Sequence, residues 1–290
     1  MNPLTYALRH PLNRGKRLAA AGRVVRWQIA CRLMVGPISV PFVEKTSLFV
    51  SRGMTGATGN WYCGLHEHEE MAFLLHFLEP NDLFMDVGAN IGSYTVLAAG
   101  VIGAHVISIE PIPSTHGSLE RNIILNGLSD RVSALCVGLS DTNSKLAFTA
   151  DMDTVNHVVF GEENRATVRV SCVTMDQVLV DSKVPKLVKI DVEGHEKAIL
   201  SGGTNTFSDL ALEAVIMEVN GSGVRYGVRD DEILSAMHDF GFAACRYDPF
   251  SRELLDWAPV RSNAIFVRNR QDATKKVKSA RSFSLVNGFI

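Results

Sequence analysis

Residues 83–94 read LFMDVGANIGSY, and this stretch decides the fold. An apolar run ends at Asp86, a turn containing Gly88 and Gly92 follows, and a helix-periodic apolar pattern starts at Ile91. A strand, a glycine loop and a helix are therefore expected in that order. Glycines let the backbone approach a ligand closely, and a helix N-terminus presents free N–H groups. The loop suits a nucleotide-like ligand, although a glycine turn after a strand is also common as plain structure.

The next acidic residue favours the ligand-binding interpretation. Glu110 closes a second apolar run 24 positions after Asp86, which is about the length of one βαβ step. A carboxylate there can accept hydrogen bonds from both hydroxyls of a ribose. The loop lacks the Lys-Ser or Lys-Thr of a Walker motif, and the spacing of Gly88 and Gly92 differs from the dinucleotide fingerprint. A nucleoside without phosphates is therefore expected, and S-adenosylmethionine is the common one.

Several motifs, in this order, resemble the FkbM family of S-adenosylmethionine-dependent methyltransferases. The matching segments are DVGANIG at 86–92, Glu110-Pro111, NIILN at 122–126 and KIDVEGHE at 189–196. Residues 64–76 are also similar to the helix that precedes that family's first core strand. The resemblance spans residues 60 to 270. It implies an α/β, Rossmann-like methyltransferase fold with a mostly parallel seven-stranded sheet, helices on both faces and an antiparallel last strand.

Composition excludes several other classes of protein. Hydrophobic residues make up 46% of the chain, which suffices for a buried sheet, and the net charge of −2 gives no general attraction to nucleic acid or membranes. The five cysteines are widely spaced and lack a Cys-x-x-Cys pair, so neither a zinc site nor a disulfide framework is expected. No charge-free run is long enough to span a membrane, and no signal peptide is evident. We therefore expect a soluble, cytoplasmic protein.

The uneven distribution of charge predicts three parts. Residues 1–60 form a basic N-terminal extension with a helix and short strands, 61–270 form the methyltransferase domain, and 271–290 form a basic C-terminal tail. The helix expected at 17–35 has arginines among its apolar residues. Such a helix can make peripheral contact with an anionic membrane surface, bind a partner, or pack on the catalytic domain with its arginines in water. We favour the last arrangement, because solvated arginines are commonplace.

The segments before the first core strand carry weaker signals. Residues 38–50 are expected to form a small hairpin and residues 52–60 a loop. Residues 66–78 should form a helix with a solvated, acidic first turn, as the helix dipole prefers. His66 and His68 are possible metal ligands by residue type, but side chains two positions apart do not share a helix face. No metal site is therefore assigned.

The densest group of polar side chains follows the fourth expected strand, residues 186–190. Asp191, Glu193 and His195 lie at its carboxyl end, where open parallel sheets bind their ligands. Methyl transfer to a hydroxyl requires a base, and His195 has a suitable unperturbed pKa. Asp191 and Glu193 could orient the hydroxyl or hold a divalent cation, but one turn does not specify an octahedral site. Structural roles in the turn are the alternative.

Other candidates come from neighbouring strand ends and from the resemblance. Glu218 ends the fifth strand and joins the catalytic candidates by position. The wider methyltransferase fold places the loop at 138–141 near the adenine, so Asp141 is a candidate, although a plain turn is the alternative. The methionine portion of the cofactor should be surrounded by Asp86, Gly88, Asn90 and Gly92, with the ribose on Glu110.

The leading hypothesis is an O-methyltransferase that uses S-adenosylmethionine to methylate a hydroxyl of a sugar, glycan or secondary metabolite. The hydroxyl acceptor rests on the resemblance alone. N-methylation of a peptide or small amine is one alternative, and a noncatalytic nucleoside-binding scaffold docking through its basic N-terminal helix is another. Nucleic acid is not an expected substrate, because no Asn-Pro-Pro-Tyr or Asp-Pro-Pro-Tyr motif follows the fourth strand.

Overall fold

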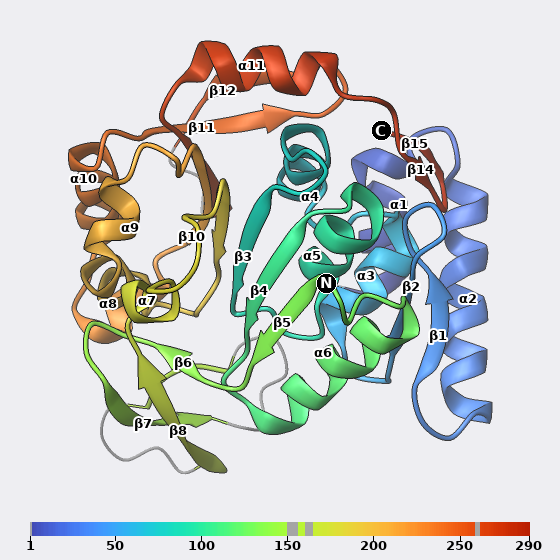
Figure 1. The fold of residues 1–290 in the computed structure, drawn as a ribbon. Coiled ribbons are helices and arrows are strands. Elements are labelled where there is room, and N and C mark those ends of the chain that lie inside the picture. Colours follow the sequence, from blue (N-terminus) through green and yellow to red (C-terminus); the bar gives the residue numbers. More distant parts are fainter. Residues whose placement is uncertain (1, 150–155, 160–164, 259–261) are drawn as a thin grey trace.

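A central sheet of eight strands organises the molecule, which a computed structural model describes over residues 2–149, 156–159, 165–258 and 262–290. The strand order is β12-β11-β13-β10-β9-β3-β4-β5 (Figure 1). Neighbours from β5 to β10 are parallel, whereas β13 is antiparallel to both β10 and β11. The strands are β3 (Leu83–Val87), β4 (His105–Ile109), β5 (Val132–Leu135), β9 (Leu187–Ile190), β10 (Ala214–Val219), β11 (Ala243–Asp248), β12 (Glu253–Asp256) and β13 (Ser262–Val267).

The predicted Rossmann-like α/β fold is confirmed, with one strand more than the seven expected. The extra strand is β12, which pairs antiparallel with β11 at the edge of the sheet. Its sequence, ELLD, carries only two apolar residues, of which Leu254 is buried and Leu255 is 42% exposed. So short a segment gives almost no periodic signal, and for that reason β12 could not be predicted.

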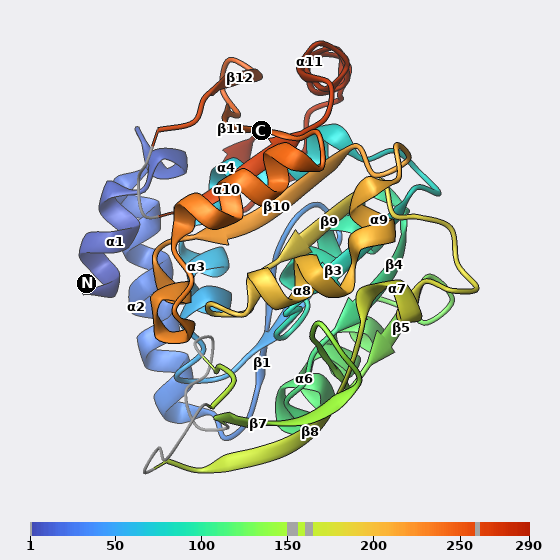
Figure 2. The same ribbon diagram turned by 90° about the vertical axis from the view of Figure 1, so that its left-hand side faces the viewer.

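Helices cover both faces of the sheet, and each face has its own apolar core. Alternate residues of β3 point to opposite sides: Phe84 belongs to one buried cluster and Met85 to the other. Figure 2 shows the second face, which is covered by α8 (Glu196–Gly202), α9 (Thr204–Ser208) and α10 (Asp230–Asp239). The first face is covered by α4 (His68–Phe77), α5 (Ser93–Val96), the π-helix η2 (Leu97–Ile102) and α6 (Pro113–Leu125).

A smaller sheet lies beside the main one. It consists of β7 (Ser144–Thr149) and β8 (Thr167–Val173), which are antiparallel, and β6 (Gly138–Leu139), which adds to β8 in parallel. The following helix α7 (Met175–Val178) begins at Thr174, whose hydroxyl accepts a hydrogen bond from the Gln177 N–H. The polar residues between β7 and β8 fall largely outside the described part of the chain.

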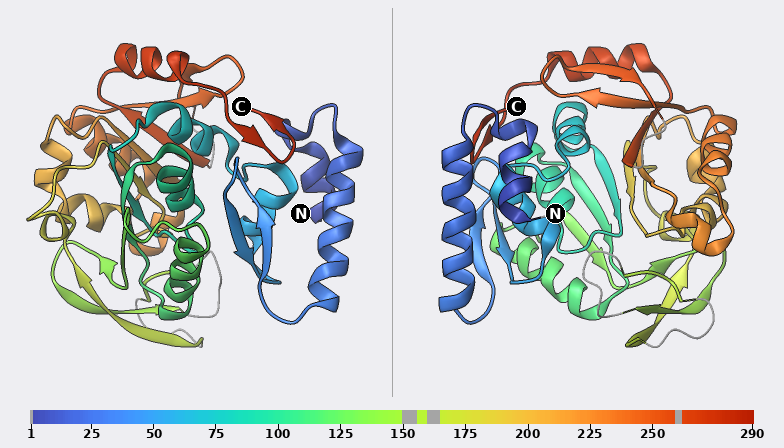
Figure 3. Two further views of the ribbon diagram at one scale, coloured as in Figure 1. Left: turned by 45° about the vertical axis from the view of Figure 1, so that its right-hand side comes forward. Right: turned by 180° about the vertical axis from the view of Figure 1, so that it is seen from behind.

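The N-terminal segment packs beside the first face of the sheet. It comprises α1 (Pro3–Arg9), α2 (Arg17–Leu33), the expected hairpin of β1 (Ile38–Pro41) with β2 (Ser47–Val50), and α3 (Thr55–Cys63) (Figure 3). The packing of α2 on the domain is confirmed, through Ala20, Val24 and Trp27. Its arginines are not all in water, however. Arg23 is buried and donates hydrogen bonds to the Tyr62 carbonyl and to Asn13 Oδ1.

The loop predicted at 52–60 is wrong, because α3 occupies most of that segment. Glycine disfavours helix, and Gly56 and Gly59 suggested a loop. In the folded chain Gly59 lies against His66, whose ring would overlap any Cβ at that position. Ala57, Tyr62 and Cys63 are buried against the rest of the protein, and this tertiary packing stabilises the helix. Tertiary packing therefore overrides a weak local preference here.

Asn122 of α6 and Asn126, which directly follows that helix, hydrogen-bond the N-terminal hairpin to the catalytic domain. The Asn122 side chain accepts from the Phe49 N–H at 2.7 Å and donates to the Ile91 carbonyl at 2.8 Å. The Asn126 side chain bonds both backbone groups of Ser47 at 2.9 Å. Residues four apart on a helix and two apart on a strand face the same way, so the two amides match the edge of β2.

The C-terminal residues are also folded onto the domain. Helix α11 (Arg270–Ser279) packs on α4 and buries Ala273 and Val277, and the chain continues into β14 (Ser284–Leu285) and β15 (Gly288–Phe289). The side-chain amide of Asn287 donates to the carbonyls of Leu12 and Cys63 and to Asn13 Oδ1. The division of the chain at residues 60 and 270 stays a prediction. Within the described residues, no helix is both long and apolar enough to cross a bilayer.

Candidate functional site

A cavity of about 230 Å³ opens at the carboxyl ends of β3, β9 and β10. This is where the chain order of the parallel strands reverses direction, between β3 and β9, which is the usual binding crevice of such sheets. Its lining includes Asn60, Glu67, Gly88, Asn90, Tyr94, Glu110, Lys189, Asp191, Glu193 and Glu218. Six of the ten residues predicted for the site therefore surround one cavity.

The glycine loop sits against the end of β9. Gly88 has a φ of +73°, and a Cβ added there would overlap the Asp191 carbonyl oxygen. Only glycine fits so close an approach in that conformation. Asn90 also has a positive φ, +51°, and its Oδ1 accepts a hydrogen bond from the Ile91 N–H at 2.7 Å. Gly92, at φ +88°, contacts Leu119 and lies outside the cavity lining.

Glu110 is held in place by backbone N–H groups. Its two oxygens accept hydrogen bonds from the N–H groups of Asn90 and Ile112, each at 2.9 Å. Burial raises the pKa of this carboxyl to about 7, although the two hydrogen bonds act to lower it. A carboxylate has room for more than one hydrogen bond at each oxygen. Glu110 therefore fits the role of a ribose acceptor, as its spacing from Asp86 predicted.

Asp86 lies behind the loop and does not line the cavity. Its Oδ2 accepts a hydrogen bond from Thr95 Oγ1 at 2.7 Å, while Oδ1 is buried without a hydrogen-bond partner among the described residues. Burial raises the pKa of Asp86, and the neighbouring Lys189 opposes that shift. A buried acceptor with an unused oxygen fits a ligand that brings a cation or an N–H donor to the glycine loop.

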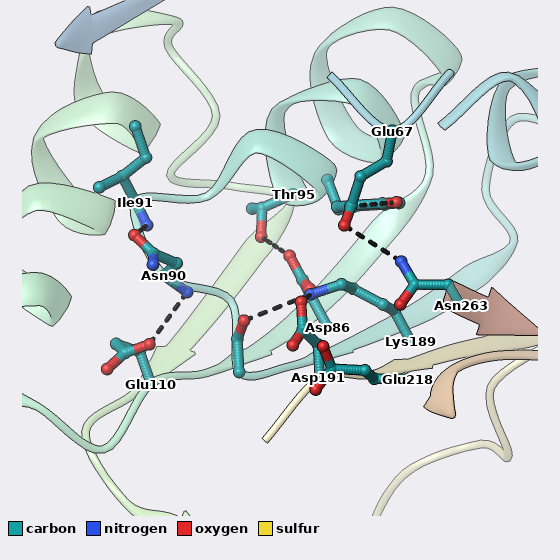
Figure 4. A network of polar contacts seen from close by, with 12 residues as sticks. Glu67, Asp86, Asn90, Ile91, Thr95, Glu110, Lys189, Asp191, Glu218 and Asn263 are labelled. Atoms are coloured by element: carbon teal, nitrogen blue, oxygen red, sulfur yellow. Dashed lines mark hydrogen bonds and ion pairs between the residues drawn. The ribbon is translucent and has the colours of Figure 1, made fainter. Parts of the chain in front are cut away.

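Lys189 is a site residue that the sequence prediction missed. It is 4% exposed, and its Nζ lies 2.9 Å from Asp191 Oδ2 and 5.0 Å from the centre of the Tyr94 ring (Figure 4). Burial alone would lower the pKa of the ammonium, but nearby carboxylates, chiefly Asp191 and Asp86, raise it above its usual value. The available signal was a lysine inside the otherwise apolar strand LVKI.

Three carboxylates gather at the ends of β9 and β10. Oxygens of Asp191, Glu193 and Glu218 all lie within 4.8 Å of one another. Burial and the charge of Asp191 raise the pKa of Glu193 to about 7 and that of Glu218 to about 9. Glu218 Oε1 accepts a hydrogen bond from Asn220 Nδ2 at 2.5 Å, and its Oε2 is buried without one in this part of the structure. Such a group can share protons or hold a cation.

His195 and Asp141 lie apart from the other candidates. His195 is 8% exposed, its Nε2 is 3.1 Å from Ser140 Oγ, and burial lowers its pKa. Asp141 is exposed, and its Oδ1 accepts from Ser140 and Thr142. Neither side chain lines the cavity. Their assignment to the site stays a prediction, and the geometry favours the three carboxylates for the acceptor side.

The acidic first turn of α4 is only partly exposed to solvent, whereas the prediction placed it in water. Glu67 lines the cavity and accepts hydrogen bonds from the Tyr94 hydroxyl at 2.8 Å and from Asn263 Nδ2 at 3.1 Å. Glu69 forms a bidentate ion pair with Arg246. Burial, together with the charge of Glu67, raises the pKa of Glu70 to about 8. The turn packs against β13 and β11, strands that are distant in sequence.

The sequence is similar to those of known methyltransferases. The methyltransferase FkbM domain matches residues 86–244. Similar proteins include the hexuronic acid methyltransferase AglP of Haloferax volcanii, 32% identical over 68% of this chain and 82% of that protein, and the methyltransferase sdnD of Sordaria araneosa, 27% identical over 67% and 84%. A putative rRNA methylase structure from Clostridium thermocellum is 12% identical, with a TM-score of 0.44 over 68% of this chain and 92% of that one. The chain therefore belongs to the FkbM family of S-adenosylmethionine-dependent methyltransferases.

Proposed function

We propose that this protein is an O-methyltransferase that methylates a hydroxyl of a sugar, a glycan or another small metabolite. One observation carries the proposal: a single cavity holds the glycine loop with Glu110 and also the carboxylates Asp191, Glu193 and Glu218. The similarity to a hexuronic acid methyltransferase supports a sugar as the acceptor. A small-molecule or glycan substrate, rather than nucleic acid, is part of this proposal.

The cofactor half of the proposal uses residues of the first two core strands. Glu110 would hold the ribose, and the backbone at Gly88 and Asn90 would hold the methionine portion, with Asp86 behind them. S-adenosylmethionine, when bound, supplies a methyl group on a positively charged sulfonium. The carboxylates around the cavity favour a cation there, because opposite charges attract strongly in a poorly solvated site.

On the acceptor side, the three clustered carboxylates would have different roles. Glu193, with a pKa of about 7, is partly ionised at neutral pH and can take the proton of an acceptor hydroxyl. Glu218, with a pKa of about 9, stays protonated and can donate a hydrogen bond. Asp191 forms an ion pair with Lys189, 2.9 Å from its Nζ. The proposed base is thus Glu193 rather than His195.

Calorimetric titration tests the cofactor half. S-adenosylmethionine should bind the wild-type protein, and Glu110→Ala should weaken binding about tenfold or more, because ribose hydroxyls would lose a charged acceptor. Glu120→Gln, on the exposed side of α6, is the matched control and should bind as the wild type does. Absence of binding, or binding untouched by Glu110→Ala, contradicts the cofactor assignment.

Transfer of labelled methyl groups tests the acceptor half. A panel of glycans and free sugars, including hexuronic acids, should contain at least one acceptor, and Glu193→Gln should slow labelling by about 10²-fold or more while S-adenosylmethionine still binds. Labelling confined to peptides or amines would support N-methylation instead. Cofactor binding without labelling of any acceptor would support a noncatalytic scaffold. The cytoplasmic location stays a prediction.

A further inference from the structure

Helix α2 is apolar on two opposite sides. One side, with Ala20, Val24 and Trp27, is buried in the domain. At 3.6 residues per turn the opposite side is centred on Ile29 and Val25, which are 54% and 55% exposed. Leu18 and Leu33 extend this stripe towards the two ends of the helix and are 91% and 78% exposed. A helix that only packs on a domain carries polar residues there.

The exposed apolar surface continues beyond α2. An open groove of about 380 Å³ runs along the helix and includes Leu4 of α1, and its walls are almost entirely apolar. Met34 and Val35, just after the helix, are 57% and 105% exposed. Seven of the fourteen exposed large apolar side chains in the described chain lie between residues 4 and 35. This concentration marks an interaction surface rather than scattered exposure.

Cations flank the apolar stripe. On the helix, Arg32 lies on one side of Ile29 and Arg26 on the other, and both are exposed, as is Arg17 in the first turn. The first 43 residues contain no acidic residue. Figures 1 and 3 show α2 as the outermost element at one edge of the molecule, so a flat surface can reach its whole length.

We propose that this face of α2, formed by Leu18, Val25, Ile29 and Leu33 with Arg26 and Arg32, docks on a bilayer surface that carries anionic headgroups. The helix would lie parallel to the membrane, with its apolar stripe at the acyl boundary and its arginines among the headgroups. Charge favours this occupant over a second copy of the chain, because two copies would bring like charges together. The proposal stands independently of the methyl acceptor.

Vesicle sedimentation with the full chain tests the proposal. Vesicles of phosphatidylcholine with about 30% phosphatidylglycerol should bind the wild-type protein, and pure phosphatidylcholine vesicles should bind it more weakly. Ile29→Ser combined with Leu33→Ser should lower the partition coefficient about tenfold or more, because two apolar side chains leave the lipid boundary. Arg26→Gln combined with Arg32→Gln should lower it about fivefold per arginine and weaken its dependence on salt.

Matched variants separate docking from folding. Ile124→Ser combined with Val180→Ser removes two side chains that are 69% and 76% exposed elsewhere, and this variant should bind like the wild type. Thermal unfolding should be unchanged in the α2 variants, because the altered side chains contact solvent. Failure of the wild type to bind, or equal binding by all variants, overturns the proposal. A wild-type dimer that Ile29→Ser with Leu33→Ser makes monomeric also overturns it, in favour of a second copy.

Discussion

At the scale of single residues, Gly88 sets how closely the ends of β3 and β9 approach. Gly88→Ala should cost about 3 kcal/mol or more in the free energy of unfolding, because a Cβ would overlap the Asp191 carbonyl in addition to straining a φ of +73°. Gly127→Ala is the matched control, with a φ of +65° and open space around it, and should cost about 1 kcal/mol. Urea unfolding of both variants measures the difference. Equal losses would mean that the close approach is unimportant.

Glu193 should impose a pH dependence on methyl transfer. Its carboxyl is protonated below its pKa of about 7, so the rate should rise about tenfold per pH unit below that value and level off above it. Glu193→Gln should lower the rate by about 10²-fold or more and remove this dependence. Rates measured over a pH series with saturating cofactor test both statements. A normal profile in Glu193→Gln would assign the base to another residue, whereas Glu253→Gln, at an exposed edge strand, should keep the wild-type profile.

The residues that could be predicted are those whose role follows from nearby sequence. Glu110 was found because its distance from Asp86 is fixed by one strand–helix–strand step. Glu67 was missed because it reaches the cavity from α4, and its partner Asn263 lies 196 positions away. The raised carboxyl pKa values also depend on burial and on charges from other strands, which no local pattern encodes.

At the scale of elements, the buried Arg23 fixes α2 to the domain. Arg23→Ala should lower the free energy of unfolding by about 2–4 kcal/mol, because the Tyr62 carbonyl and Asn13 Oδ1 would each lose a charged donor inside the protein. Arg26→Ala, on the exposed side of the same helix, should change it by less than about 0.5 kcal/mol. Chemical denaturation compares the two. Similar effects would show that burial does not distinguish these arginines.

Local patterns predicted the long elements better than the short ones. Strands β3, β4, β9 and β10 and helix α4 each carry enough apolar residues to show a pattern, and all of them were predicted. Helix α3 was missed because its glycines disfavour helix and its stability comes from His66 and other contacts outside it. Strand β12 was missed because four residues carry too little pattern.

At the scale of the whole molecule, the buried glutamates should make stability depend on pH. Five glutamates have pKa values between about 7 and about 9 in the folded protein. They are Glu70, Glu110, Glu193, Glu196 and Glu218. Unfolding returns them to ordinary values near 4.5, so between these limits the folded state binds more protons. The free energy of unfolding should therefore fall as pH rises from about 5 to about 9.

Urea unfolding across that range measures the slope. Glu218→Gln removes a carboxyl that can ionise, so the free energy of unfolding should depend less on pH. Glu120→Gln alters an exposed side chain on α6 and should leave the slope unaltered. A free energy of unfolding that rises with pH in the wild type would mean that the glutamates are ionised in the folded state at ordinary pH values.

The contacts of Asn287 have a consequence for how the chain folds. Its amide bonds Asn13, 274 positions earlier, as well as Leu12 and Cys63. During synthesis α1 and α2 are made before β14 and β15, so this part of their packing cannot be completed until those two strands have been made. Contacts of such long sequence separation form slowly, because a large loop must close first. Until then the packing around Leu12 and Asn13 is incomplete, and this part of a nascent chain is more open to aggregation.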